Sequence, residues 1–578
     1  MTVFRVWAPD ASRAEVEVSG QRHPLAAGGA PGWWETDLPV AAHGTDYAFR
    51  LDGGDPLPDP RSPWQPLGPA GASRTYDHSV FRWTDDGWRG APLAGSLVYE
   101  LHVGTFTDEG TLDAAVARLG HLAGLGVTTV ELMPVAPFPG RRGWGYDGIS
   151  LWAVYEPYGG PDGLKRFVDA CHARGLAVVL DVVYNHVGIG NQLAKFGPYF
   201  TDARVTPWGL AVNLDQPGSD EVRAFLAGNA LMWLEDYHLD GLRLDAVHAL
   251  EDHRAVHFLE ELAVNVHALA ARLNRELVLI AESDANDPRL VTAREAGGYG
   301  LTGQWNDDFH HAVHAAVTGE RRGYYGDFGS IGALAKTLTR VFFHDGGWSQ
   351  FRGRQHGRPV DTGRIPGDRF VGYLQNHDQI GNRATGDRIS AALPAGLVKT
   401  GAGLVLTAPF TPMLFMGEEW AASTPWQFFA DHPDAGLARA VARGRRAEFA
   451  SFGWGAADVP DPEAEATFLR SKLDWSELDS GPHREVLAWY RELIALRRAR
   501  PELADPRLGG VRADYDEDGR WLVVWRGALR IAANLGGCAQ RLPLGGPGRA
   551  VLAASSAAVA LDGDAVTMPA GGFAVVEV

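Results

Sequence analysis

Short apolar segments that alternate with helix-like segments run through most of this 578-residue chain and limit what it can fold into. The segment Leu176–Val183 is an almost continuous apolar run, which is typical of a parallel strand covered on both faces. Comparable strand patterns recur with helical patterns between them, and about eight such units predict a (β/α)8 TIM barrel with insertions. The predicted barrel strands are Leu97–Leu101, Val127–Leu132, Leu176–Val183, Asp240–Leu244, Leu277–Ala281, Leu301–Trp305, Phe370–Leu374 and Met413–Met416.

The two ends of the chain have a different pattern from the middle. Val3–Trp7 and Ala14–Val18 alternate in polarity and are separated by Gly and Pro clusters, which predicts an all-β unit. Short strand patterns such as Trp521–Trp525 predict a small C-terminal β-sandwich domain. Because a chain of this length exceeds one core, we expect several domains. Their predicted ranges are 1–92, 93–500 with a short insertion at 187–215, and 501–578; helices are predicted at Thr111–Ala123, Asp162–Arg174, Asp220–Tyr237, Arg254–Leu273 and Arg484–Arg498.

The composition excludes several classes of partner. A net charge of −18 argues against nucleic acid and against anionic membrane surfaces, and so favours uncharged ligands. The two cysteines, Cys171 and Cys538, lie far apart and form no metal or redox motif, which favours a reducing compartment. We find neither a signal-peptide pattern at the start nor an apolar run long enough to cross a bilayer. We therefore predict a cytoplasmic protein that binds no membrane.

Polar side chains follow four of the predicted strands at the point where each strand ends. They are Asp181, Asn185 and His186 at the third strand, Arg243 and Asp245 at the fourth, Glu282 at the fifth, and Asn376, His377 and Asp378 at the seventh. A barrel enzyme builds its active site at the carboxyl ends of its strands, so we expect these groups at one rim. Four strands that each deliver carboxylates or histidines favour a functional site over unrelated structural ion pairs.

The strand Asp240–Leu244 carries the strongest single signal. Leu242 and Leu244 share one face by the two-residue period, whereas Arg243 and Asp245 share the other. A fixed cation beside Asp245 keeps that carboxylate ionised near neutral pH, as a nucleophile must be. Taken alone, such a pair is also compatible with a structural ion pair at a strand end.

Four segments resemble the signature regions of the α-amylase family of glycoside hydrolases. They are Asp181–His186, Asp240–Asp245, Ile280–Asp284 and Asn376–Asp378, and the likeness extends over Ser96–Arg500. The resemblance implies that Asp245 is the nucleophile and that Glu282 is the general acid and base. It implies Asp378 as a third carboxylate, which holds hydroxyls of the sugar next to the broken bond.

The need for such carboxylates follows from the chemistry of an α-glycosidic bond. A retaining enzyme uses one ionised carboxylate to attack and one protonated carboxyl to protonate the leaving oxygen, the two being roughly 5–5.5 Å apart. Their surroundings must push the two pKa values apart. Arg243 favours the ionised form of Asp245, whereas an apolar strand and the neighbouring carboxylates would raise the pKa of Glu282.

Several side chains around these carboxylates are candidates for substrate binding. His186 and His377 are suited to hydrogen-bond sugar hydroxyls, although either can instead be a satisfied rim residue. Tyr146 resembles the family's aromatic that stacks on the sugar before the cut, and its alternative is a core aromatic. Asp147, which follows it, and Arg243 complete this group.

Three longer segments narrow the resemblance to one branch of the family, the maltooligosyltrehalose trehalohydrolases. They are Leu374–Arg383, Gln304–His311 and Phe415–Glu419. That resemblance implies hydrolysis of the α-1,4 bond next to the terminal trehalose of maltooligosyltrehalose, which releases trehalose and a maltooligosaccharide. It also implies that the enzyme acts after a maltooligosyltrehalose synthase. Gln379 and Arg383, in the first segment, are then expected to bind substrate.

The side chains that read the trehalose unit are expected on the leaving-group side. Our candidates are Trp305, Asp307, Asp308 and His248, and for Asp308 we expect a direct role in selecting trehalose. The alternative for Asp307 and Asp308 is helix capping with a solvated face.

One departure from the wider family concerns calcium. Many α-amylases bind calcium partly through a His four residues after the nucleophile, but Ala249 occupies that position here and His248 precedes it. Asn185 alone is a poor site, because calcium takes six to eight oxygen ligands. We therefore predict no structural calcium and no other cofactor.

The role of the predicted unit 1–92 is open, and two rival functions remain for the whole chain. Phe4–Asp10 and Gly32–Glu35 resemble the immunoglobulin-like sandwich that precedes the barrel in glycogen-branching and debranching enzymes, so this unit is either a carbohydrate-binding module or a structural appendage. A glycogen branching enzyme would use the same nucleophile, with sugar instead of water as the second attacking group. A catalytically inactive barrel that serves as a binding module is the other rival, and the intact Asp245, Glu282 and Asp378 argue against it.

Overall fold

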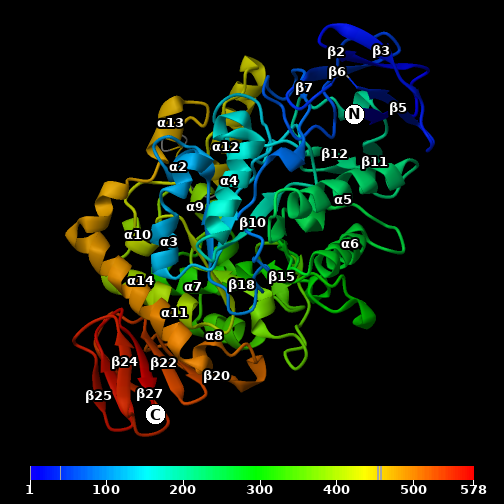
Figure 1. Cartoon of the computed structure of the whole chain (residues 1–578). Helices are drawn as coiled ribbons and strands as arrows, with labels where there is room; N and C mark the ends of the chain where they lie inside the picture. The colour runs from blue at the N-terminus through cyan, green and yellow to red at the C-terminus, as the bar shows by residue number, and fades with distance from the viewer. Residues whose placement is uncertain (1, 40, 452–454, 456–458) are drawn as a thin grey trace.

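The computed structural model describes residues 2–39, 41–451, 455 and 459–578. Eight parallel strands close into a barrel in the order β10-β13-β14-β15-β18-β19-β8-β9, which confirms the predicted fold class. Figure 1 shows the barrel at the centre, with the N-terminal and C-terminal β-rich parts at opposite ends. The barrel strands are β8 (Val98–Leu101), β9 (Thr129–Leu132), β10 (Ala177–Val182), β13 (Gly241–Leu244), β14 (Val278–Ala281), β15 (Gly303–Trp305), β18 (Phe370–Tyr373) and β19 (Thr411–Phe415).

Side chains cap the starts of some of the helices around the barrel. The helix predicted at Thr111–Ala123 is divided into two, and the Thr111 hydroxyl accepts the N–H of Ala114 at the first start. Helix α6 begins at Phe258 rather than Arg254, because the Asp252 carboxylate accepts the N–H of Phe258 at 2.6 Å. The main helices are α2 (Leu112–Val116), α3 (Leu119–Leu125), α4 (Gly160–His172), α5 (Ser219–Glu235), α6 (Phe258–Leu273), α7 (Asp307–Thr318), α8 (Ile331–Arg340), α11 (Ala395–Thr407) and α14 (Gly481–Ala499).

The interior of the barrel is filled in layers to which alternate strands contribute. The register of the strands places Val98, Val179, Ile280 and Val371 at one level, and these apolar side chains belong to one buried cluster. The next level toward the carboxyl ends holds Glu131, Arg243, Trp305 and Met413. Above it lie Glu100, Asp181, Tyr373 and the position of Glu282. The interior therefore changes from apolar to charged as it approaches the rim.

Two small antiparallel sheets form the N-terminal part. One holds β1 (Thr2–Trp7), β5 (Trp33–Leu38) and β4 (Ala26–Ala27), and the other β3 (Gln21–Pro24), β2 (Ala14–Val18), β6 (Asp46–Leu51) and β7 (Ser73–Arg74). The Arg61 guanidinium lies 5.4 Å from the Trp33 ring and 5.2 Å from the ring of Phe225 in α5. Trp33 is buried, so it packs at the contact with the barrel.

The C-terminal part packs against helix α8 and completes its N-terminus. Its two sheets have the orders β20-β21-β22-β27-β24 and β23-β26-β25. The Glu517 carboxylate accepts the N–H groups of Ile331 at 2.9 Å and Gly332 at 2.7 Å, and the Ser330 hydroxyl accepts that of Ala333. These side chains pair the first free donors of α8. The strands are β20 (Val511–Asp516), β21 (Trp521–Arg526), β22 (Leu529–Asn534), β23 (Gln540–Pro543), β24 (Ala550–Ala554), β25 (Ala560–Asp562), β26 (Ala565–Met568) and β27 (Phe573–Glu577).

The secondary structure changes between the β-rich ends and the barrel close to residues 92 and 500. Strand β8 begins at Val98, helix α14 ends at Ala499 and β20 begins at Val511. We propose these two positions as domain boundaries. The expected insertion at 187–215 contains a hairpin of β11 (Phe200–Thr206) and β12 (Gly209–Val212).

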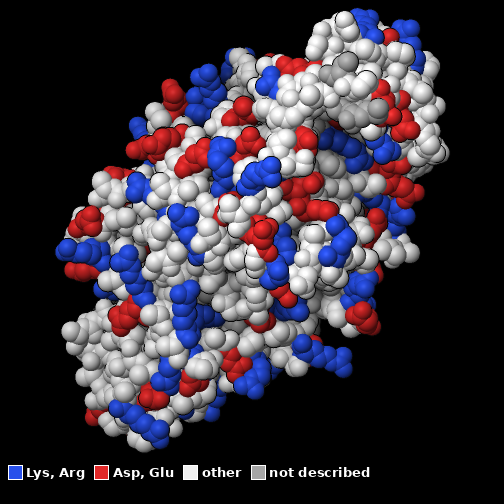
Figure 2. Space-filling model, in the orientation of Figure 1, with Lys and Arg blue, Asp and Glu red and all other residues white. Residues whose placement is uncertain are grey.

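The surface carries both signs of charge. Acidic and basic side chains are interspersed over the face of the molecule in Figure 2. In the part of the chain that the structure describes, no helix has the length and apolar character needed to cross a membrane.

Candidate active site

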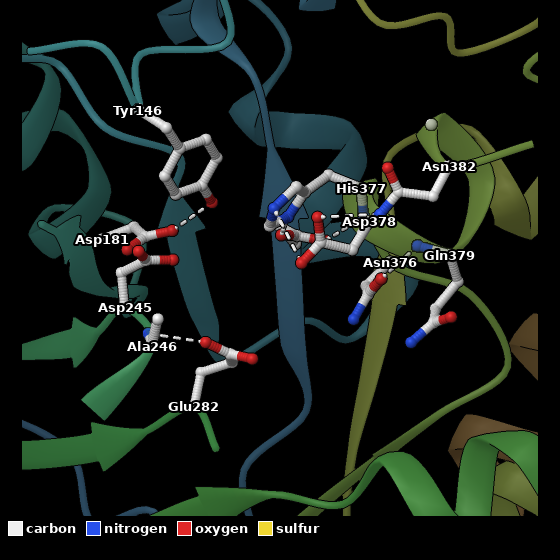
Figure 3. Close-up of polar contacts among 12 residues, drawn as sticks. Tyr146, Asp181, Asp245, Ala246, Glu282, Asn376, His377, Asp378, Gln379 and Asn382 are labelled. Atoms are coloured by element: carbon white, nitrogen blue, oxygen red, sulfur yellow. Dashed lines mark hydrogen bonds and ion pairs between the residues drawn. The ribbon is translucent and has the colours of Figure 1, made fainter. Parts of the chain in front are cut away.

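Asp245 lies directly after β13 and is held by two neighbours. Its Oδ1 accepts a hydrogen bond from Arg243 Nη1 at 2.8 Å, and its Oδ2 accepts one from Asn185 Nδ2 at 2.9 Å. The side chain remains 12% exposed. In Figure 3 its carboxylate and that of Glu282 come from neighbouring strands, and Asp378 faces them from the other side.

Ala246 links the two carboxylates through an unusual backbone conformation. Its φ of 39° lies in the left-handed region, which a residue with a Cβ rarely adopts. This turn directs the Ala246 N–H to Glu282 Oε2 at 2.6 Å, and the next N–H, of Val247, reaches the Glu282 carbonyl at 3.0 Å. The strained turn after Asp245 therefore fixes Glu282 beside it.

Glu282 lies after β14 in surroundings that favour its neutral form. Burial raises the pKa of Glu282 well above its usual range. Asp245, Asp307 and Asp378 raise the pKa further, and Arg243, whose Nη2 is 3.7 Å from Glu282 Oε2, opposes them. These surroundings favour the protonated carboxyl, which a general acid needs.

Arg243 is fully buried and organises three groups at the rim. Its Nη1 donates to both Asp181 oxygens, at 2.7 and 2.8 Å, as well as to Asp245. Asp181 also accepts a hydrogen bond from the Tyr146 hydroxyl at 2.5 Å. Burial raises the pKa of Asp181 to about 6, although Arg243 and Tyr146 oppose the change. Arg243 is thus a positioning cation for Asp245 and does not face the open site.

Asp378 is the most exposed of the three candidate catalytic carboxylates. It lies in the short helix α9 (His377–Gly381), and 39% of its side chain is exposed. His377 Nε2 is 3.5 Å from Asp378 Oδ2. The Nδ1 atom and the backbone N–H of His377 both contact Glu100. Burial lowers the pKa of His377, but Asp378 and Glu100 outweigh it and raise the pKa to about 9. A protonated His377 is therefore fixed between two carboxylates.

The other expected residues on this side lie around Tyr146. The Tyr146 ring stacks on His377 with 5.1 Å between ring centroids. His186 Nε2 contacts the Tyr146 carbonyl at 3.0 Å and its Nδ1 contacts Asn185, so both ring nitrogens have protein partners. Asp147 is exposed. Burial lowers the pKa of His186, and the charges of Asp245 and Asp147 only partly oppose the change. His186 therefore supports the rim more directly than it offers free groups to a sugar.

Asp307 faces the site from the start of α7. It accepts hydrogen bonds from the Tyr373 hydroxyl and, at 3.4 Å, from Gln379 Nε2. Gln379 in turn accepts one from the Tyr324 hydroxyl at 3.1 Å. Burial raises the pKa of Asp307 to about 6. This cluster joins the ends of β15 and β18.

The expectation that Asp308 reads the substrate directly is wrong. The side chain is buried, and Oδ2 accepts the N–H of His344 at 2.8 Å and Asn286 Nδ2 at 2.9 Å. Successive residues of an α-helix point in different directions. Asp308 therefore points away from the rim, whereas Asp307 faces it. Asp308 holds the loops after β14 and α8 together.

Trp305 also lies elsewhere than expected. It is 2% exposed and packs inside the barrel, where its ring lies 4.3 Å from the Arg243 guanidinium carbon. Trp305 is an inward-facing residue one level below the rim, so Arg243 and the carboxylates cover it. It supports Arg243 and leaves no surface for a sugar.

The two remaining expected residues are His248 and Arg383. His248 is partly exposed, and its Nδ1 is 3.9 Å from Asp284 Oδ1. Arg383 is held by Glu320 at 2.8 Å and by Asp387 at 2.9 Å. A small hollow of about 100 Å³ lies beside Arg383. Its lining includes Glu320, Tyr324, Tyr325, Asn382, Arg383 and Phe449.

Two residues at the site were not anticipated from the sequence. Glu100 holds His377 from the first barrel strand, and its only sequence signal is a carboxylate inside the apolar segment Leu97–Leu101. Trp208, at the tip of the β11–β12 hairpin, stacks on His186 with 5.1 Å between ring centroids and is 48% exposed. Its place at the rim depends on how the hairpin folds back.

Metal binding has no support in the geometry. Across the described ranges, no three His, Cys, Asp or Glu side chains are grouped so as to hold a metal ion. The Asn185 amide contacts Asp245 through Nδ2 and His186 through Oδ1, so its oxygen already has a partner.

Comparisons with known proteins show the family of the chain. The catalytic-domain model of the α-amylases matches residues 76–197, and a model of a domain of unknown function matches residues 506–576. A malto-oligosyltrehalose trehalohydrolase from Rhizobium sp. (strain M-11) is 52% identical over 98% of this chain and 96% of its own. One from Arthrobacter ramosus is 56% identical over 92% of each chain. The chain belongs to the malto-oligosyltrehalose trehalohydrolase family.

A solved structure has the same fold over the whole length of this chain. A Salmonella typhimurium protein assigned to the α-amylases is 39% identical, with a TM-score of 0.91 over 100% of this chain and 97% of that one. A 1,4-α-glucan branching enzyme from Xanthomonas euvesicatoria is only 31% identical over 75% of this chain. The trehalohydrolase family, and not the branching enzymes, is therefore the closer group, and the chain is a glycoside hydrolase.

Proposed function

We propose that this chain hydrolyses the α-1,4-glucosidic bond next to the terminal trehalose of maltooligosyltrehalose and releases trehalose and a maltooligosaccharide. The observation that carries the mechanism is the pairing of Asp245, fixed by Arg243 and Asn185, with Glu282 beside it, whose surroundings raise its pKa and favour its neutral form. Membership of the trehalohydrolase family supports the choice of substrate.

The proposed reaction proceeds by two displacements with retention of configuration. Asp245 attacks the anomeric carbon while Glu282 donates its proton to the glycosidic oxygen, and the trehalose unit leaves. Glu282, now ionised, takes a proton from water, which attacks the covalent intermediate and releases Asp245. Asp378, partly exposed opposite them, would hold hydroxyls of the sugar that undergoes displacement.

The proposed binding residues divide by distance from these carboxylates. Tyr146 and His377 form a stacked pair at the glycosyl side, and Asp307 with Gln379 forms the polar group at the leaving-group side. His248 and Arg383 border that side, Asp147 and His186 border the first, and Arg243 positions the nucleophile. A synthase that supplies the substrate and a cytoplasmic location stay predictions.

Product analysis tests the proposal. The enzyme is incubated with maltooligosyltrehalose and, separately, with plain maltooligosaccharide of equal length, and the products are separated by chromatography. Free trehalose from the first substrate, formed faster than any product from the second, is the expected result. New branches with an unchanged number of reducing ends would instead identify a branching enzyme.

A further inference from the structure

The barrel layer below the catalytic carboxylates contains polar atoms that the protein leaves unpaired. The layer consists of Glu131, Arg243, Trp305 and Met413, one from every second strand. Within the part of the chain described, both Glu131 oxygens, Arg243 Nε and Nη2, and Trp305 Nε1 are buried without a hydrogen-bond partner. Three of the four side chains in this single layer therefore have unmet hydrogen-bonding capacity.

Such a concentration of unpaired atoms indicates ordered water. Buried polar groups almost always have a partner, and an internal water pairs two to four groups that cannot reach one another. Arg243 and Trp305 contribute only donors here, whereas Glu131 contributes acceptors. Glu131 and Arg243 have no direct ion pair among the contacts of the described residues. The charge of Arg243 nevertheless lowers the pKa of Glu131 against the effect of burial, so the two groups lie near enough for water to bridge them.

The surroundings of Glu131 favour its neutral form. Its side chain is 1% exposed, and its register partner on β8 is Glu100, the carboxylate that holds His377. Burial raises the pKa of Glu131 well above its usual range, and Glu100 raises it further. A neutral carboxyl both donates and accepts, so it can hold water without adding charge to the layer.

Arg243 needs support from this direction. Its hydrogen bonds to Asp181 and Asp245 all pass through Nη1, and Nη2 has only a 3.7 Å ion pair with Glu282, so no hydrogen bond fixes the rest of the guanidinium. The Trp305 ring, 4.3 Å away, supports one face but restrains rotation in the plane only weakly. Partners for Nε and Nη2 would fix the orientation of the whole group.

We propose that Glu131 binds ordered water inside the barrel, which pairs Nε and Nη2 of Arg243 and Nε1 of Trp305 and so fixes Arg243 under Asp245. Glu131 is then a positioning residue that acts on the nucleophile through water and Arg243. This inference rests on the proposed roles of Arg243 and Asp245. It assigns a polar function to a position that a barrel interior normally fills with an apolar side chain.

Three variants separate hydrogen bonding from packing. Glu131→Leu removes the polar group at similar volume, Glu131→Gln keeps a neutral donor and acceptor, and Met413→Leu changes an apolar side chain of the same layer. We expect Glu131→Leu to lower kcat by about 10- to 100-fold with little change in KM, because a misplaced catalytic group costs rate rather than binding. Glu131→Gln and Met413→Leu should stay within about threefold of wild type.

A high-resolution crystal structure of the wild-type protein provides the direct reading. Water within hydrogen-bond distance of both Glu131 and Arg243 is expected, and density without water there would overturn the proposal. Equal losses in Glu131→Gln and Glu131→Leu, or none in Glu131→Leu, would also overturn it. If Glu131→Leu does not fold, the wild-type density and the activity of Glu131→Gln decide. Rates are measured on whichever α-glucan wild type cleaves, so a wrong substrate assignment does not affect the outcome.

Discussion

Two pairs of carboxylates follow neighbouring strands of this barrel and have different uses. Asp245 and Glu282, after β13 and β14, are fixed by donors and still reach the open site. Asp307 and Asp308 both begin α7 after β15, yet only Asp307 contacts the rim residues Tyr373 and Gln379. Asp308 is buried under the loops that it holds. Proximity to a strand end therefore predicts the neighbourhood of a carboxylate but not the direction in which it points.

The largest expected effect tests the first pair. Asp245→Asn keeps the shape of the side chain but cannot attack the anomeric carbon, so we expect kcat to fall by about four orders of magnitude, the scale for an essential catalytic group. Steady-state rates and a thermal melt measure activity and folding together. Asp308→Asn is the matched control, because it changes a neighbouring strand-end carboxylate outside the reaction. Activity of Asp245→Asn within tenfold of wild type would refute its role as nucleophile.

Much of this pair was readable from the sequence, because its signals are local. An apolar run, a two-residue period and a turn place Arg243 and Asp245 at one end of a strand, and the structure confirms all eight predicted strands. Trp305 was misplaced because its level inside the barrel depends on the register between strands, which a single segment does not encode. Trp208 and Glu100 depend in the same way on contacts between distant segments.

The next prediction concerns the charges of His377 and Glu100, which lie behind the rim. His377 has a pKa of about 9, above the roughly 6.5 of an unfolded chain. Its stabilising contribution is therefore complete below about pH 6.5 and is lost as the pH rises through about 9, in total roughly 3 kcal/mol. Glu100→Gln removes one anionic partner, so we expect this loss to move to lower pH. Denaturant unfolding between pH 6 and pH 10 measures the change, and identical pH profiles would contradict it.

A smaller effect is expected to distinguish the roles of Asp307 and Asp308. We expect Asp307→Ala to lower kcat/KM for maltooligosyltrehalose about tenfold more than for plain maltooligosaccharide, because it removes a polar group at the leaving-group side. Asp308→Ala should lower both values by one factor and reduce the free energy of unfolding by about 1–3 kcal/mol, since two buried donors lose their partner. The ratio of the two kcat/KM values distinguishes them. A changed ratio in Asp308→Ala would restore a direct role for that residue.

The last prediction is that removal of metal ions has no effect on the enzyme. The Asn185 amide is already hydrogen-bonded to Asp245 and His186. We therefore expect that a chelator changes neither the activity nor the melting temperature. Parallel melts with chelator, with added calcium and with neither provide the measurement. A fall in melting temperature that calcium alone reverses would show that the first pair of carboxylates depends on a metal ion.

The Glu517 cap on α8 affects how this chain can be shortened or recombined. Because the cap donated by the C-terminal sheet pairs Ile331 and Gly332, a chain that stops near residue 505 would begin α8 with two uncompensated donors. That helix precedes the loop whose His344 is held by Asp308. We therefore expect a truncated or domain-exchanged enzyme to lose order in α8 and in the loop that carries His344.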